Sequence, residues 1–576
     1  MWTKRASGRK IVMVKKYIRI MCKNERNCKM NLAKRYVRRL KTEFSGYNGK
    51  KFGKDLLAGI TVAAVALPLA LAFGVSSGAD AASGLVTALM AGLIMGVFSG
   101  ASYQISGPTG AMSAILISLV AQHGLNGVFI ACLISGVILL ICGIFKLGGI
   151  VSFIPTPVIT GFTSGIAIII AFGQINNLTG LTSEGESTID KLISYFTLEQ
   201  SFNMTSFLIG LAVIVFMFIY PKKLNGIVPS SLVAIILATI ANFIFKFDVS
   251  VVGEIPKTLF LENRLDISAI NWSEINGLII PAVSIAALGL IESLLCGASA
   301  GRMKNEPIDS DMELVAQGLG NIIIPFFGGV PATAAIARTS VAIKAGGQTR
   351  LTSIIHSVVL ILSMFLLGGV MSKIPLAALA GVLIVTAVRM NEFEVIKDIF
   401  GRKIKTAMFQ FLITMVATVI FDLTIAIIIG VLFSVIMFVL KVSEMTVNIS
   451  GIRTDNMDVS EKALKTFAKT RVAYITGPLY FGTANKLRDR LKEVVTDDEE
   501  YVIFSVRGVP IADLSGVSAL NELCDELMAQ NKKIYFSCVN PTVTEMFQRC
   551  GLEEKIGKDN FFWSTDKVLD YLGKED

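Results

Sequence analysis

The chain has 576 residues, of which 53% are hydrophobic and only 17% are charged. This composition excludes an ordinary soluble enzyme and indicates a large membrane domain with an appendage. The net charge of +10 is concentrated in residues 1–54, which hold 18 Lys/Arg against 2 Asp/Glu, whereas the remainder holds 36 against 42. A general affinity for nucleic acid is therefore not indicated.

Residues 1–54 form a basic arm that we expect to lie in the cytoplasm. No convincing signal peptide precedes the first long apolar run, which begins near Leu56. Met30 precedes a cleaner amphipathic stretch, so translation could begin at Met1 or at Met30. From Lys34 to Lys54, apolar residues are interleaved with basic ones. This part either lies on an anionic inner leaflet or is a disordered tail.

Residues 55–443 are a succession of hydrophobic segments, which we expect to be a transmembrane transport domain of fourteen spans. Several are shorter than the ~20 residues that a straight helical crossing needs. The expected spans are 55–75, 84–99, 105–121, 125–145, 153–174, 203–220, 228–246, 276–298, 312–328, 332–345, 350–371, 375–390, 404–421 and 423–441.

Two of these segments are interrupted by glycine and proline, which do not continue a helix. Ser106–Ser113 and Phe326–Thr339 each run through Gly, Pro and Thr into small residues, and Pro108 and Pro331 are 223 residues apart. The helix that follows each proline exposes free N–H groups and a partial positive charge, which suit an anion. Fourteen spans divide into two sets of seven. Because seven is odd, the halves have opposite orientation, so we predict an inverted repeat with the binding site at the two interruptions.

Loop charges set the expected orientation. Basic residues recur in alternate loops, which are therefore expected on the same side as the basic arm. These residues are Lys146, Lys222, Lys223, Arg302, Lys304, Lys344, Arg350, Arg402, Lys403 and Lys405.

Residues 444–576 have the pattern of a soluble domain. Strand-like runs at 472–476, 501–506 and 533–539 alternate with helical stretches near 483–494, 516–529, 541–549 and 565–572. We expect a small cytoplasmic α/β domain.

Glu292 and Arg338 are charged residues that lie well inside predicted spans. Glu292 stands in the apolar run that opens the second half, where an acid is costly and is by default a functional candidate. Desolvation favours its neutral form, so it could carry a proton; alternatively it is a permanently protonated or paired core residue. Arg338 can hold an oxyanion through two hydrogen bonds. Its alternative role is an ion pair with Glu292, for which an anion could compete.

The sequence lacks the residue patterns of metal binding, nucleotide binding and nucleophilic catalysis. The eight cysteines form no CxxC pair, and His123 and His356 are too few and too far apart for a metal cluster. No phosphate-binding GxxxxGK[ST] loop occurs, so we expect gradients or exchange, not ATP, to supply energy. No nucleophile with a base partner is visible. We therefore expect neither an enzyme, a cofactor nor a metal.

Several motifs together resemble the sulfate permease family of anion transporters, from about residue 44 to the C-terminus. They are Ile105–Thr109, Gly328–Ser340, Ile343–Gly347, and, in a tail that is similar to the family's STAS domain, Arg507–Pro510 followed by Asp513–Gly516. The resemblance implies an inverted-repeat fold with core and gate domains, usually dimeric. It also implies an anion held between the facing ends of the third and tenth spans and moved by an elevator-like shift of the core.

The resemblance also implies site residues. Ala337 stands where many relatives have serine, so only its backbone N–H remains for a contact. The implied substrate-binding residues are Thr109, Gly110 and Ala111 at the first end and Thr333, Ala337 and Arg338 at the second.

Coupling and regulatory residues are implied in the same way. Glu292 matches a position that is Asp, with a hydroxyl residue four positions later, in relatives regarded as sodium-coupled. Here the later residue is Cys296, whose sulfur is a poor ligand for a hard cation, which favours protons over sodium. Ser515 aligns with a serine that is phosphorylated in some STAS relatives; its alternative role is to cap a helix that starts at residue 516.

We therefore predict a secondary active importer of a small inorganic oxyanion, most simply sulfate, coupled to protons. Bicarbonate, a dicarboxylate, a channel-like anion conductance and a membrane sensor acting through the STAS domain remain alternatives. The expected partners are the anion, protons, membrane lipid and a second copy of the chain, in the cytoplasmic membrane.

Overall fold

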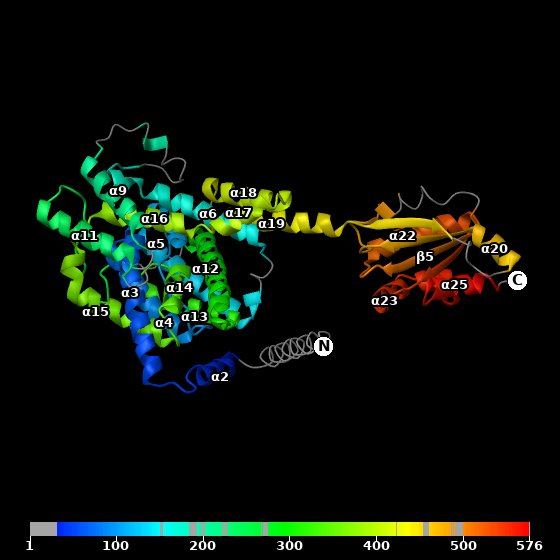
Figure 1. The fold of residues 1–576 in the computed structure, drawn as a ribbon, viewed down its shortest axis with the longest axis horizontal. Coiled ribbons are helices and arrows are strands. Elements are labelled where there is room, and N and C mark those ends of the chain that lie inside the picture. The colour runs from blue at the N-terminus through cyan, green and yellow to red at the C-terminus, as the bar shows by residue number, and fades with distance from the viewer. Residues whose placement is uncertain are drawn as a thin grey trace, which may run out of the picture. The chain divides into compact units, whose positions relative to one another are not determined.

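The computed structural model describes residues 32–149, 154–183, 193–195, 197, 202–221, 224, 228–266, 268, 275–421, 423–452, 460–484, 486–487, 489 and 499–574. The chain forms two compact units that divide between Leu432 and Phe433 (Figure 1). We refer to them as the helical unit and the α/β unit. The predicted basic loop at Lys222 and Lys223 and most of the predicted helix at 483–494 lie outside the described residues.

Helices in the helical unit follow the predicted hydrophobic segments. Within the described residues, seven helices are long and apolar enough to cross a membrane. Four shorter apolar helices accompany them. The number of spans is therefore approximate. The first-half elements are α3 (Gly49–Ser76), α4 (Ala81–Phe98), β1 (Ser106–Gly107), α5 (Gly110–Ile144), α6 (Thr156–Gly173), α7 (Ile175–Thr179), α9 (Met204–Ile219) and α11 (Ser230–Phe245). The second-half elements are α12 (Ile275–Lys304), α13 (Ser310–Ile323), η3 (Ile324–Phe327), β2 (Thr333–Ala334), α14 (Ile336–Lys344), α15 (Leu351–Met371), α16 (Leu376–Met390), α17 (Phe393–Gly401), α18 (Lys405–Ile420) and α19 (Leu423–Val442).

The helix packing repeats between the two halves. Helix α3 packs on α15 as α12 packs on α5, and α4 packs on α15 as α13 packs on α5. Likewise α6 packs on α18 as α16 packs on α9. Each pair of contacts relates helices at equivalent places in the two halves, as an inverted repeat requires.

Glycines allow helices α5 and α13 to pack closely against each other. A Cβ at Gly136 of α5 would lie 2.6 Å from the backbone nitrogen of Ile322, and one at Gly318 of α13 would lie 2.6 Å from that of Leu140. Backbone contact of this kind is the usual way for helices to associate where burial of apolar surface offers no advantage over lipid.

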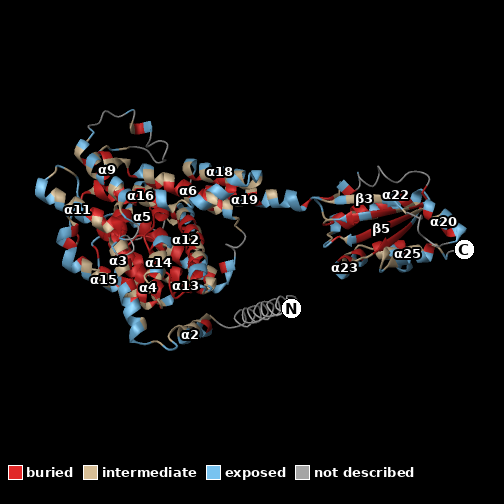
Figure 2. Ribbon diagram, viewed as in Figure 1, coloured by how far each residue is buried: buried red, intermediate tan, exposed pale blue. Residues whose placement is uncertain are grey.

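Burial separates an inner group of helices from an outer one. Buried residues are concentrated where α4, α5, α12, α13 and α14 meet, whereas α9, α11 and α15 carry many exposed residues (Figure 2). The exposed residues include large apolar side chains such as Ile219 and Leu366, which are 75% and 77% exposed. An apolar exterior of this kind suits lipid contact.

The basic arm continues as a helix, α2 (Leu32–Glu43), whose Arg35 forms an ion pair with Asp311 at 2.9 Å. A disordered tail is therefore wrong for this part of the arm. The helix that contains the first predicted span begins before residue 55, because the Asn48 side chain caps α3 by accepting a hydrogen bond from the Lys51 N–H.

The α/β unit has a five-stranded sheet in the order β3-β4-β5-β6-β7, with β3 and β4 antiparallel and the other neighbours parallel. Three strands occupy the predicted runs, and β3 and β7 were not predicted. The elements are β3 (Thr446–Gly451), α20 (Glu461–Ala468), β4 (Thr470–Thr476), β5 (Tyr501–Gly508), α22 (Leu514–Ala529), β6 (Lys533–Ser537), α23 (Pro541–Arg549), α24 (Leu552–Ile556), η4 (Lys558–Asn560), β7 (Phe561–Phe562) and α25 (Thr565–Leu572).

Candidate anion-binding site

The two interrupted segments meet inside the helical unit. Strand β1 pairs antiparallel with β2, with Ser106 opposite Ala334 and Gly107 opposite Thr333. The Ala335 N–H extends this pairing by donating to the Ile105 carbonyl at 2.9 Å. Because α5 follows β1 and α14 follows β2, the starts of two helices from opposite halves of the chain lie at one place.

Polar side chains replace the backbone partners that a two-residue strand pair lacks. Asn321 of α13 accepts a hydrogen bond from the Ala332 N–H at 2.8 Å and donates one to the Ala332 carbonyl at 2.9 Å. The hydroxyl of Ser293 on α12 forms a hydrogen bond with the hydroxyl of Thr333 on β2, at 2.8 Å. Thr333 is fully buried, so it holds β2 in place.

The start of α5 contains Thr109, Gly110 and Ala111. The Thr109 hydroxyl caps the helix by accepting from the Met112 N–H at 3.4 Å, and it donates to Oε2 of Glu292 at 2.9 Å. Gly110 and Ala111 are buried and have no long side chain to cover their backbone. The first N–H groups of a helix have no intrahelical acceptor, so this end can bind an acceptor atom.

The start of α14 is more accessible. Its N-cap residue, Ala335, has no side chain that can cap the helix, and Ile336 and Ala337 are exposed. The Ala337 N–H therefore belongs to an uncapped first turn with the partial positive charge of a helix start. The missing serine hydroxyl at this position leaves the backbone as the donor.

The guanidinium of Arg338 lies beside Gly107 and Pro108, and the residue is only 1% exposed. Its Nη2 donates to the Pro108 carbonyl at 3.2 Å, while Nη1 has no hydrogen-bond partner among the described residues. A Cβ at Gly107 would lie 2.2 Å from Nη1, so only glycine allows the guanidinium this position. The arginine thus joins the second half of the chain to the first and places a positive charge near both helix starts.

The alternative ion pair between Arg338 and Glu292 is wrong for this structure. Glu292 is half-buried on α12, and its carboxylate faces Thr109, whereas the guanidinium faces Pro108. Each side chain therefore has its own partner in the segment between β1 and α5, and no ion pair joins them among the described residues.

Cys296, one turn after Glu292, is directed elsewhere. Its Sγ donates to the Thr339 hydroxyl at 3.4 Å, and that hydroxyl also accepts from the Ile105 N–H at 3.0 Å. Cys296 is fully buried. Its position indicates that it packs α12 against the strand pair, while Glu292 is the acid that lies at the site.

A buried polar row on α13 was missed by the sequence interpretation. Glu313, Gln317 and Asn321 are each 0% exposed. Glu313 accepts from the Ser99 hydroxyl at 2.7 Å and from Gln317 Nε2 at 2.7 Å, and Gln317 Nε2 also donates to the Ser106 hydroxyl at 2.9 Å. The spacing of four residues within an apolar helix is the signal that could have identified this row.

In the α/β unit, Ser515 is exposed in the first turn of α22. The expectation that Ser515 caps this helix is wrong. Asp513 is the cap, because its Oδ1 accepts from the Gly516 N–H at 2.8 Å and the helix begins at Leu514. The hydroxyl of Ser515 is therefore not needed for capping.

Comparisons with known proteins agree with this architecture. The chain matches the sulfate permease family over residues 52–417 and the STAS domain over residues 462–568. It is 35% identical to a protein of Bacillus subtilis described as the putative sulfate transporter YvdB, over 92% of this chain and 99% of that one. It is 28% identical to the bicarbonate transporter BicA of Picosynechococcus, over 89% of this chain and 94% of that one.

Solved structures show the same fold. A murine structure of Slc26a9, described as an anion transporter in the inward-facing state, superposes with a TM-score of 0.79 at 18% identity, covering 91% of each chain. The transmembrane domain of a cyanobacterial bicarbonate transporter, BicA, superposes with a TM-score of 0.59 at 28% identity, covering 68% of this chain and 98% of that one. The chain belongs to the sulfate permease family of membrane anion transporters and carries a C-terminal STAS domain.

Proposed function

We propose that the protein is a proton-coupled secondary active importer of a small inorganic oxyanion, with sulfate as the first candidate. The observation that carries this proposal is the meeting of two helix starts, at Thr109 and Ala335, with the buried charge of Arg338 beneath them. Two positive helix ends and a guanidinium form a preorganised environment for an anion.

In this proposal the anion contacts the first-turn N–H groups of α5 and α14. Thr109, Gly110 and Ala111 supply one end of the site, and the Ala337 N–H supplies the other. Thr333 holds the strand pair. Arg338 adds positive potential near the anion, and its Nη2 is already bonded to the Pro108 carbonyl. This differs from the direct two-bond contact that the sequence suggested.

Glu292 is the proposed proton carrier. In its ionised form the carboxylate accepts from Thr109 and places a negative charge beside the start of α5, where it opposes an incoming anion. Protonation removes that charge. Proton and anion binding therefore favour each other, and the coupling is reciprocal.

The packing of the helices supports an elevator-like movement. Helices α3, α4, α5 and α12 to α15 form a core body that contains the site, and α6, α9, α11, α16 and α18 form a second set with its own mutual contacts. We propose that the core shifts against this gate. We also propose that the transport domain covers residues 55–443, that the STAS domain covers residues 444–576, and that both it and the N-terminal arm are cytoplasmic.

Bicarbonate is the second candidate substrate, because a relative 28% identical to this chain is named a bicarbonate transporter. Uptake of labelled sulfate, bicarbonate and succinate into proteoliposomes, with an inward proton or sodium gradient, separates the candidates. Saturable sulfate accumulation driven by protons is expected. Large unsaturable currents, or uptake that follows sodium, would exclude the proposal. Crosslinking of the purified protein tests the homodimer that the family resemblance implies.

A further inference from the structure

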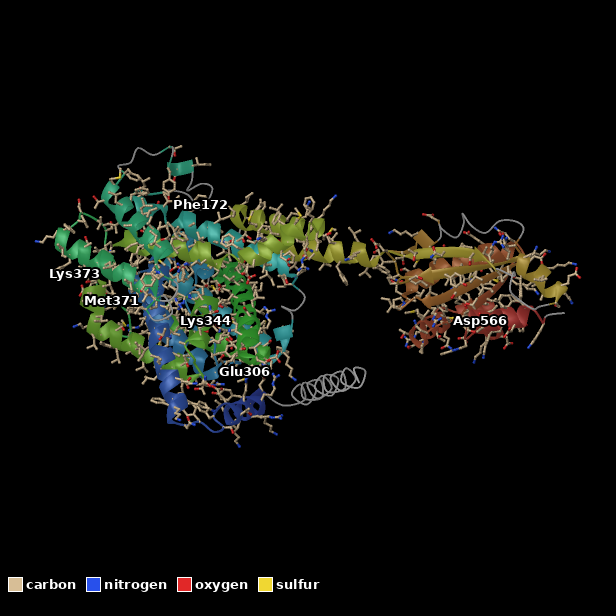
Figure 3. All side chains as sticks on the ribbon, viewed as in Figure 1. Phe172, Glu306, Lys344, Met371, Lys373 and Asp566 are labelled. Carbon is tan, nitrogen blue, oxygen red and sulfur yellow. The ribbon has the colours of Figure 1, made fainter. Side chains whose placement is uncertain are left out.

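One face of α2 is fastened to the core body. Arg35 pairs with Asp311 at 2.9 Å and with Asp309 at 3.5 Å, and Arg39 donates to the Pro307 carbonyl at 2.7 Å. Pro307 and the two aspartates lie at or just before the start of α13. Glu306, in the same segment, lies close to α2 (Figure 3).

The same face of α2 reaches two other core helices. Glu43 accepts from Nη2 of Arg350 at 2.8 Å, and both side chains are largely buried. The Tyr36 hydroxyl donates to the Val97 carbonyl of α4 at 2.9 Å. Residues 35, 39 and 43 are four apart, so they form one stripe of the helix. Several partly buried ion pairs make this attachment specific to the core.

The opposite face of α2 is basic and exposed. Lys34 and Lys41 are exposed seven residues apart, and Val37 between them is 50% exposed. The charges on α2 are therefore divided. One stripe pairs within the protein, and the other presents cations around an apolar side chain.

Helix α3, which follows α2 in the chain, begins with lysines that precede exposed apolar residues. Helix α2 lies beside the lower end of α3, and residues 44–48 join the two helices (Figure 1). The first two turns of α3 carry the exposed Lys50 and Lys54, and Leu57 and Ile60 then follow at 62% and 46% exposure. Lysines directly before exposed apolar residues mark the depth of lipid headgroups, which long basic side chains can reach.

We propose that the exposed face of α2, defined by Lys34, Val37 and Lys41, binds the anionic headgroups of the adjacent leaflet and thereby attaches the core body to the bilayer surface. Charge complementarity and the closeness of α2 to the start of α3 both favour lipid. A helix with cations around an apolar residue suits a bilayer surface. Because α2 is fastened to α4, α13 and α15, anionic lipid acts on the body that contains the anion site.

The direct test is amine labelling of the full chain, reconstituted in phosphatidylcholine vesicles with or without phosphatidylglycerol, with modification at each lysine measured by mass spectrometry. We expect Lys34 and Lys41 to be labelled severalfold more slowly with phosphatidylglycerol, and 0.5 M NaCl to remove the protection. Lys558 and Lys567, exposed in the α/β unit, serve as internal controls. Equal labelling in both lipids overturns the proposal.

A variant pair gives a second readout. Lys34→Gln/Lys41→Gln leaves the docked stripe intact and should weaken phosphatidylglycerol binding, measured by native mass spectrometry, by about fivefold for each lysine. The matched control, Lys558→Gln/Lys567→Gln, should bind as the wild type does. Protection that is equally strong in pure phosphatidylcholine and vanishes when single copies are placed in nanodiscs would identify a second protein copy as the occupant and refute the lipid proposal.

Discussion

The hydroxyl of Thr109 donates to the carboxylate of Glu292 across 183 positions of sequence, at 2.9 Å. Thr109 is also the N-cap of α5, so one side chain joins the acid to a helix start at the proposed anion site. This relationship connects the proposed proton carrier to the proposed anion site without an ion pair to Arg338.

The first prediction follows from this contact. Glu292→Gln imitates the protonated acid, so it should retain anion binding and exchange but lose accumulation driven by an inward proton gradient. The measurement is labelled-anion uptake at fixed internal pH while external pH is lowered. Wild-type uptake should rise as external pH falls, because protonation removes a charge that opposes the anion. A Gln variant that keeps the wild-type pH dependence would contradict this assignment.

The second prediction concerns Arg338. Arg338→Ala should weaken anion affinity ten- to a hundredfold, or ~1.5–3 kcal/mol, because it removes a buried charge near both helix starts. Arg338→Lys keeps the charge but not the reach to the Pro108 carbonyl, so its affinity should fall less. Equilibrium binding to purified, folded protein measures both. Wild-type affinity in the Ala variant would show that the guanidinium only supports the fold.

The third prediction tests the buried row on α13. Gln317→Leu removes the donor that joins Glu313 to Ser106, and it leaves two buried acceptors unpaired. We expect a lower melting temperature, with a loss of ~1–3 kcal/mol, together with weaker anion binding. Gln317→Glu, which keeps the shape but not the donor, should behave similarly. Thermal unfolding in detergent and binding assays check this; two unchanged values would mean that the row is dispensable.

The fourth prediction concerns Asp55, which is fully buried where α3 begins. It accepts hydrogen bonds from the Thr349 hydroxyl at 2.6 Å and the Thr352 hydroxyl at 3.0 Å, and so fixes the loop after α14. Burial and the neighbouring carboxylate raise the pKa of Tyr47, which donates to Asp55 at 2.8 Å, to about 12. Asp55→Ala should therefore lower the melting temperature and lower the pKa of Tyr47.

The raised pKa of Tyr47 determines how the stability of the fold depends on pH. A tyrosine whose pKa is higher in the folded state contributes stability that is present below its unfolded pKa of 10.0 and is lost as pH rises toward 12. The contact should therefore contribute its full stability near neutral pH, and that contribution should not change with pH until the pH rises above about 10. A difference ultraviolet titration of wild type against Tyr47→Phe measures the pKa. A Tyr47 that titrates near 10 in the wild type would disagree with this account.

The fifth prediction concerns the C-terminal domain. Deletion of residues 450–576 should reduce assembly or activity but leave the order of preferred anions unchanged, because both helix starts lie in the helical unit. Competition between labelled sulfate and unlabelled anions measures that order. A stable truncated protein with an altered order would argue against the proposed domain division.

The sequence by itself determined the features that depend on local pattern. Hydrophobic segments, the glycine and proline interruptions at 106–113 and 326–339, and the change of character near residue 442 each depend on neighbouring residues. These features were sufficient to predict a polytopic helical protein with an α/β tail. The motifs predicted the family, and the comparisons with known proteins confirmed it.

The tertiary structure decided which side chains meet, because such contacts join residues far apart in the chain. It directed Arg338 to Pro108 and Cys296 to Thr339. It also paired Arg35 of α2 with Asp311 of α13. Residue types alone allowed an Arg338–Glu292 pair, since opposite charges attract wherever they meet. In the structure each side chain has another partner on the segment between β1 and α5, because the guanidinium donates to the Pro108 carbonyl and the carboxylate accepts from the Thr109 hydroxyl.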